Sequence, residues 1–89
     1  MFIDQLPPHE KRVVRRRLTA LNAASTPADA NLPGYGLTLY QETGGEKLYS
    51  INAGNDLRIL FTYRNNTVVV LDVVRHSQIE RLAHNQRGH

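Results

Sequence analysis

Two basic side chains in the second half of the chain have the type and position that phosphate chemistry requires. Arg58 interrupts an otherwise apolar run over residues 57–61, and a guanidinium group can hold two phosphate oxygens at once. His76 follows a second apolar run, and an imidazole exchanges its proton near neutral pH, as an acid or base catalyst must. Arg75 precedes His76, and strand alternation directs it to the opposite face. Arg58 and His76 are therefore the leading catalytic candidates, with Arg75 as a third.

Each of these residues also has a structural interpretation. Arg58 could pair with a carboxylate on a neighbouring strand, either Asp72 or Glu46. His76 could cap or pack against a following helix. Glu46 could serve as a general base, but its position beside a predicted turn favours an exposed surface residue.

Lys47 and Tyr49 alternate onto one face of another predicted strand. Lys47 could hold a phosphate, and Tyr49 could stack on a base, as aromatic side chains do with single-stranded RNA. For Tyr49 the packing of a core aromatic ring is the favoured interpretation.

Basic residues are concentrated near the N-terminus. Residues 11–17 hold five of the eleven lysines and arginines of a chain whose net charge is +3. Such a patch favours a polyanionic partner, either nucleic acid or an acidic protein. Lys11, Arg15 and Arg16 would then contact phosphates, which positions a nucleic acid without reading its sequence. The alternative is an ordinary solvated helix face.

The composition limits the classes of protein to consider. A chain of 89 residues is expected to form one domain, residues 1–89. It has no cysteine, which excludes disulfides, thiol catalysis and cysteine-ligated zinc. The histidines show no ligand spacing, so we predict neither a metal nor a cofactor. We expect no signal peptide and no membrane segment, because no stretch approaches the roughly 20 apolar residues that a span needs; a cytoplasmic protein is expected.

Helical patterning begins at a pair of prolines. Residues 8–24 are predicted as a helix, with Val14, Leu18 and Leu21 recurring at i, i+4 and i+7. Thr26 followed by Pro27 resembles a helix start, so a short helical turn over residues 27–31 is expected. Ser77 and Glu80 fit a capping box, which predicts a short C-terminal helix from Gln78 to about residue 85.

From Leu37 the period changes to that of strands. Four strands are predicted over residues 37–42, 46–53, 57–64 and 67–75. Asn65 and Asn66 are expected to form a tight hairpin, because asparagine tolerates positive φ. Residues 68–71 are apolar at every position, which predicts a central strand covered on both faces. Short turns favour antiparallel pairing, so the predicted fold is α+β: a curled four-stranded antiparallel sheet with helices on one face.

Three parts of the sequence resemble a known family. Residues 18–24 with 32–37, residues 49–52 with 57–61, and residues 70–76 are similar, in order, to the corresponding parts of HigB-like plasmid-maintenance killers, a branch of the RelE/ParE toxin superfamily. The resemblance covers about residues 10–80. It implies a RelE-like fold, in which the usual first strand is here missing or reduced to residues 1–6.

The resemblance implies a bacterial type II toxin that cleaves messenger RNA on the ribosome without a metal. In that reaction the 2′-hydroxyl attacks the adjacent phosphate and the 5′-oxygen leaves, which requires a base, an acid and cations. Arg58 matches the strand arginine of the family and His76 the histidine that ends the last strand. The implied partners are a cognate antitoxin, the ribosome with its mRNA, and operator DNA reached through the antitoxin.

The sequence also departs from the family pattern. Val74-Arg75-His76 stands where relatives carry Asp-Tyr-His, and no tyrosine follows His76. These departures leave two alternatives open. One is a poison of DNA gyrase, as in the ParE branch, and the other is a non-catalytic relative that acts as a binding or regulatory partner of its antitoxin.

Overall fold

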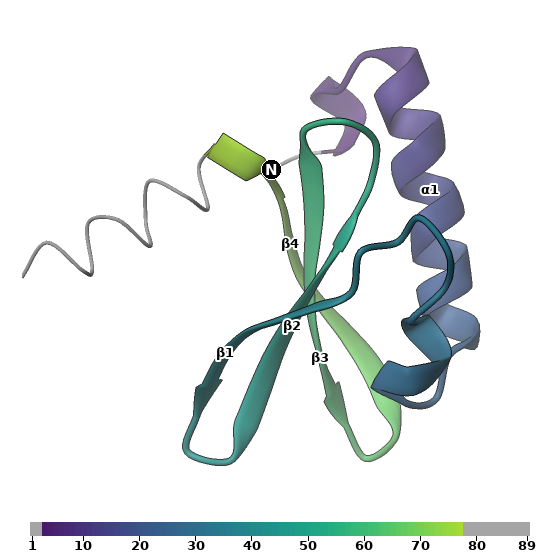
Figure 1. Cartoon of the computed structure of the whole chain (residues 1–89). Coiled ribbons are helices and arrows are strands. Elements are labelled where there is room, and N and C mark those ends of the chain that lie inside the picture. The colour runs from purple at the N-terminus through teal and green to yellow at the C-terminus, as the bar shows by residue number, and fades with distance from the viewer. Residues whose placement is uncertain (1–2, 78–89) are drawn as a thin grey trace, which may run out of the picture.

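The fold consists of one long helix packed on a four-stranded antiparallel sheet. The computed structural model describes residues 3–77, and Figure 1 shows their arrangement. The elements are η1 (Ile3–Gln5), α1 (Pro8–Ala23), η2 (Pro27–Ala30), β1 (Thr38–Thr43), β2 (Glu46–Asn52), β3 (Leu57–Arg64) and β4 (Thr67–Arg75). The sheet order is β1-β2-β3-β4. The predicted α+β class is therefore confirmed, whereas the predicted C-terminal helix lies outside the described residues.

Helix α1 starts and ends close to the predicted positions. Proline occupies its first turn, where the missing N–H has no intrahelical partner in any case. The buried stripe contains Val14 and Leu21, which are 0% and 1% exposed, with Leu18 packed partly against the same core. No helix among residues 3–77 is long and apolar enough to cross a membrane.

Two turns follow local sequence signals. Thr26 caps η2 by accepting a hydrogen bond from the Asp29 N–H at 3.4 Å, which confirms the predicted helical turn. Asn65 and Asn66 have φ values of 55° and 61°, the left-handed region that a tight hairpin between β3 and β4 requires.

The core lies between α1 and one face of the sheet. Alternate residues of β3 supply its centre: Leu57, Ile59 and Phe61 are 1%, 0% and 0% exposed. Ile51 of β2 and Val73 of β4 join the same cluster, since Ile51 and Val73 both pair with Ile59. The other face of the sheet carries no helix within the described part of the chain.

The two hairpins separate toward their turns (Figure 1). The pairing of β2 with β3 extends from Asn52 and Arg58 only as far as Tyr49 and Phe61. Beyond this point the Thr62 hydroxyl donates a hydrogen bond of 2.7 Å to the Lys47 carbonyl oxygen. A side chain thus satisfies a carbonyl at the point where the backbone ladder stops.

The prediction of a central strand covered on both faces is wrong for β4. This strand lies at the edge of the sheet, and Val70 and Leu71 are 41% and 49% exposed. A continuous apolar run cannot distinguish a central strand from an exposed edge, because sheet order depends on contacts that are distant in sequence. A bulge opposite Leu60 and Phe61 also disturbs the alternation at Leu71. His76 consequently follows an edge strand.

Two adjacent hydroxyl groups on β3 provide a test of this packing. Thr62→Val should lower the free energy of unfolding by about 1–3 kcal/mol, because the Lys47 carbonyl loses its partner. Tyr63→Phe should cause no such loss, because the Tyr63 hydroxyl is buried without a partner among the described residues. Urea unfolding followed by circular dichroism would measure both, and equal losses would contradict the assignment.

Candidate functional site

Arg58, the first of the predicted catalytic residues, forms few side-chain contacts among residues 3–77. It lies on β3 between the fully buried Leu57 and Ile59, so alternation directs it to the face away from α1. Its side chain is half-buried, and its Nη1 donates a hydrogen bond of 2.9 Å to the Leu57 carbonyl oxygen. Among residues 3–77 no carboxylate forms an ion pair with this guanidinium.

The carboxylates considered as partners of Arg58 have other contacts. Glu46 accepts a 2.8 Å hydrogen bond from Arg64, and Asp72 accepts one of 2.8 Å from the Val73 N–H. Neither neutralises Arg58 within the described part of the chain. Arg58 therefore presents positive charge on the sheet face opposite the helix.

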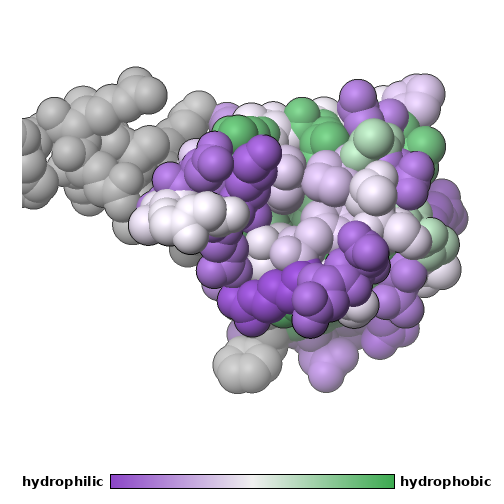
Figure 2. Space-filling model, turned by 90° about the horizontal axis from the view of Figure 1, so that it is seen from below, coloured by the Kyte–Doolittle hydropathy of each residue, from purple (hydrophilic) through white to green (hydrophobic). Residues whose placement is uncertain are grey.

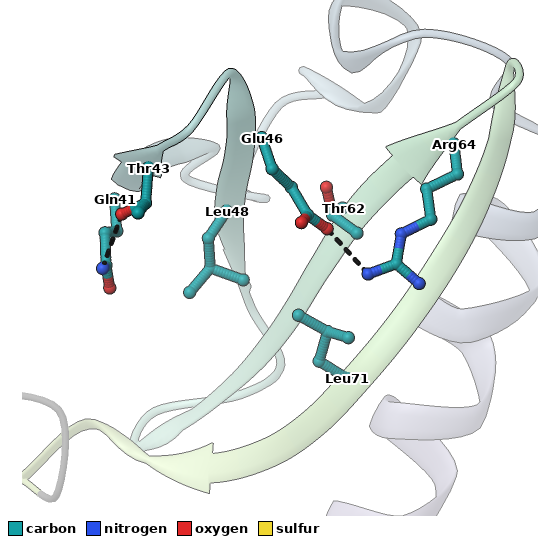
Figure 3. Close-up of a pocket in the computed structure, with 7 residues that line it drawn as sticks. All are labelled: Gln41, Thr43, Glu46, Leu48, Thr62, Arg64 and Leu71. Atoms are coloured by element: carbon teal, nitrogen blue, oxygen red, sulfur yellow. Dashed lines mark hydrogen bonds and ion pairs between the residues drawn. The ribbon is translucent and has the colours of Figure 1, made fainter.

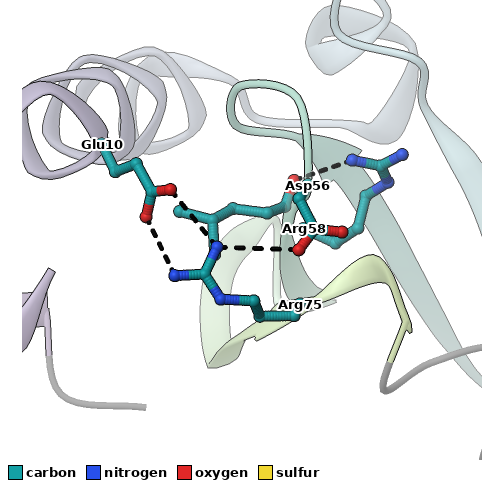
Figure 4. A network of polar contacts seen from close by, with 5 residues as sticks. Glu10, Asp56, Arg58 and Arg75 are labelled. Atoms are coloured by element: carbon teal, nitrogen blue, oxygen red, sulfur yellow. Dashed lines mark hydrogen bonds and ion pairs between the residues drawn. The ribbon is translucent and has the colours of Figure 1, made fainter. Parts of the chain in front are cut away.

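Arg75 lies on the other face, in an ion-pair network (Figure 4). Its two terminal nitrogens donate hydrogen bonds of 3.3 and 3.2 Å to the two carboxylate oxygens of Glu10. Nη1 also lies 3.6 Å from Asp56 Oδ2. The hydrogen bond and charge of Glu10, followed by Asp56, raise the pKa of Arg75 above its ordinary value. Arg75 thus connects the first turn of α1 to the end of β4, and Figure 4 shows the Arg58 guanidinium pointing away from it.

His76 lies one residue beyond β4, close in register to Arg58. Its backbone N–H donates a 2.6 Å hydrogen bond to the Asp56 carbonyl oxygen, which continues the pairing that joins Arg58 to Val74 and Leu57 to Arg75. The residue is half-buried. The fold therefore brings Arg58 and His76 to the same end of the β3–β4 hairpin, although they are distant in sequence.

Lys47 and Tyr49 lie away from this end of the sheet. Tyr49 pairs with Phe61, whereas the partner of Arg58 is Asn52, so about 10 Å of strand separates Tyr49 from that pair. Tyr49 stacks on Phe61 with 5.7 Å between ring centroids and faces α1, which supports the core-packing interpretation. The exposed Lys47 shares that face, so neither residue joins Arg58 in one cluster.

The basic cluster of α1 is not a uniform cationic face. Arg15 lies 3.9 Å from Asp4 in an exposed ion pair, while Arg16 is exposed and Lys11 half-buried. The Arg17 guanidinium lies 3.9 Å from the centre of the Tyr35 ring, a cation–π contact that the charge pattern did not predict. This contact attaches the connector after η2 to α1, and leaves the exposed cations as the candidate phosphate contacts.

A pocket that the sequence did not predict lies where the hairpins separate (Figure 3). Its volume is ≈ 350 Å³, and its lining residues are Gln41, Thr43, Glu46, Leu48, Thr62, Arg64 and Leu71. The Glu46–Arg64 ion pair of 2.8 Å joins β2 to β3 across it. Figure 2, seen from the end with the hairpin turns, shows a mainly hydrophilic surface with apolar patches along one rim. The pocket results from strand divergence, for which the sequence carries no local signal.

The described residues 3–77 contain no group of three or more histidine, aspartate or glutamate side chains arranged to hold a metal ion. Comparison of the chain with protein-family models, curated proteins and solved structures found no significant match.

Arg75 and Arg58 should differ in their effect on folding. Arg75→Ala should lower the midpoint of thermal unfolding, because Glu10 and Asp56 lose the cation that they share. Arg58→Ala should change the midpoint little, because only one backbone carbonyl is lost as a partner. Differential scanning calorimetry at low and high salt measures both, and the Arg75 effect should shrink as salt screens the ion pairs. A larger effect at Arg58 would contradict these roles.

Tyr63 should make stability depend on alkaline pH. Burial, followed by the charges of Asp29 and Tyr49, raises the pKa of Tyr63 above its ordinary value of 10.0. Because the folded state holds this proton more tightly, its contribution is complete below pH 10 and is lost as pH rises through the folded pKa. Unfolding free energies of the wild type should therefore fall more steeply above about pH 10 than those of Tyr63→Phe. Parallel pH profiles would contradict the prediction.

Proposed function

We propose that this chain is a RelE/HigB-type toxin, a metal-independent endoribonuclease that cleaves mRNA on the ribosome and is held inactive by a cognate antitoxin in the bacterial cytoplasm. The observation that carries the proposal is Arg58: a half-buried guanidinium on a sheet face, without a carboxylate partner among residues 3–77. Such a group has the charge and geometry to bind a phosphodiester.

Arg58 binds the scissile phosphate in this proposal, and it stabilises the negative charge that grows on the non-bridging oxygens. The 2′-oxygen forms a bond to phosphorus as its proton passes to a base, and the bond to the 5′-oxygen breaks as that oxygen takes up a proton. His76, at the same end of the β3–β4 hairpin, supplies one of these proton transfers. Arg75 maintains the position of the strand end and has no direct part in the reaction.

The remaining cations serve to position the ribosome and its RNA. Lys11, Arg15 and Arg16 of α1 contact phosphates of ribosomal RNA, and Lys47 provides a further contact near the β1–β2 turn. These contacts fix orientation and carry no sequence preference. Affinity for the ribosome should consequently fall with increasing salt, in proportion to the number of phosphates contacted.

One observation favours the alternative of a non-catalytic relative. Arg75, a candidate for catalysis, forms ion pairs with Glu10 and Asp56. The candidate catalytic residues are then only Arg58 and His76. In this alternative the chain retains binding to its antitoxin, and Arg58 serves as a contact for an acidic partner.

Cleavage of mRNA by purified protein on translating ribosomes is the direct test. Arg58→Ala and His76→Ala should each slow cleavage by roughly 10²–10³-fold, the range expected for loss of an electrostatic or acid–base group. Arg64→Ala is the matched control, because Arg64 lies on the same strand but pairs with Glu46; its rate should stay near that of the wild type.

Negative results of the cleavage assay distinguish between the alternative functions. No cleavage by the wild type, together with antitoxin binding, would favour the non-catalytic alternative. Inhibition of DNA supercoiling in a gyrase assay, without RNA cleavage, would place the chain among the gyrase poisons. Equal cleavage by all variants would remove Arg58 and His76 from the mechanism.

A further inference from the structure

The two edges of the sheet differ in how well they are protected against pairing with another strand. Edge strands are usually short, charged or interrupted, because an unpaired ladder accepts any further strand. β1 is six residues long and carries Glu42. β4 is nine residues long, and its first five residues, 67–71, contain no charge and no proline. Apart from the bulge at Leu71, residues 67–71 of the β4 edge therefore lack the usual protection.

The exposed part of β4 is also apolar. Val70 and Leu71 are 41% and 49% exposed, and among residues 3–77 β4 pairs only with β3. Within residues 3–77, no strand pairs with the outer edge of β4, and exposed aliphatic side chains lie beside that edge. Strand addition satisfies both, since backbone hydrogen bonds form while apolar side chains are buried.

We propose that the β4 edge pairs with the β4 edge of a second copy of this chain, antiparallel, about a two-fold axis through Val69. Thr62 pairs with Val69, whereas Phe61 and Tyr63 pair with Val70 and Val68. Val68 and Val70 therefore share the α1-facing side, and Val69 lies on the other. An axis through Val69 places Val68 opposite Val70 of the second copy, and the dimer contains one continuous eight-stranded sheet.

The register of this pairing favours a second copy of the chain as the partner of the β4 edge. The axis through Val69 also places Thr67 opposite Leu71, so residues 67–71 meet without any charged side chain. Like charges are therefore kept out of the strand contact despite the net charge of +3. An axis through Val70 would place Val68 opposite Asp72, which lies on the other face because it pairs with Leu60. A strand edge that matches itself in one register is the requirement of an isologous dimer.

The interface is small, so the dimer should be reversible. Five residues from each copy bury less than the roughly 1,200–2,000 Å² of a stable interface. We therefore expect association that depends on protein concentration, with a dissociation constant in the micromolar range. Val70→Lys should shift the equilibrium to monomer, because it places a charge in the strand contact of each copy.

A single introduced cysteine tests the register, because the full chain has none. Val69→Cys brings its own Cα near that of the second copy, within the roughly 4.4–6.8 Å that a disulfide spans. Under mild oxidation at high protein concentration it should form covalent dimers in high yield. Leu39→Cys is the matched control: Leu39 is 49% exposed on β1, the opposite edge, and should remain largely monomeric.

Sedimentation equilibrium of the wild type completes the test. Concentration-dependent dimerisation, its loss in Val70→Lys with unchanged circular dichroism, and selective crosslinking at residue 69 would together support the proposal. A wild type that remains monomeric at high concentration would overturn it. Equal crosslinking of Val69→Cys and Leu39→Cys would also overturn it, because random collision would then explain the disulfide. Dimers that persist in Val70→Lys would place the interface on another surface.

Discussion

The structure depends on the burial of one face of β3 beneath α1. Leu57, Ile59 and Phe61 are almost completely removed from solvent, and each contributes about 1.5–3 kcal/mol relative to exposure. Because strand side chains alternate, the burial of these three residues directs Arg58 to the opposite face. The position of the proposed phosphate site is thus a consequence of core packing.

The same constraint explains why the candidate residues separate into two groups. Tyr49 pairs with Phe61 and Arg75 with Leu57, so both face α1 with the core. Tyr49 then completes an aromatic cluster, and Arg75 meets the carboxylate of Glu10. Tyr49 and Arg75 are thus used for packing and ion pairing on the helix side, whereas Arg58 lies on the uncovered face without an ion pair among residues 3–77.

Local signals predicted the elements well, and long-range contacts could not be predicted. The helix expected over residues 8–24 is found as Pro8–Ala23, because proline at the start and apolar periodicity act within a few residues. The Asn65–Asn66 turn was likewise visible, since both residues tolerate positive φ. Arg75 and Glu10 are 65 positions apart, and their pairing follows only from strand order and register. The edge position of β4 and the separation of the hairpins were missed for the same reason.

The desolvation cost of the half-buried Arg58 guanidinium is the strongest argument that this residue has a function. Partial burial of a guanidinium removes some of its hydration, and the one backbone carbonyl that Arg58 meets among residues 3–77 replaces only part of what is lost. A carboxylate on a neighbouring strand would compensate for that loss. Two lie on the uncovered face within residues 3–77, but Glu46 pairs with Arg64 and Asp72 accepts a hydrogen bond from the Val73 N–H. A chain under selection for stability alone would place an aliphatic residue or a paired cation at this position. Residues that lower the stability of the fold in this way are concentrated at functional sites. An anionic ligand would supply the ion pair that Arg58 lacks among residues 3–77.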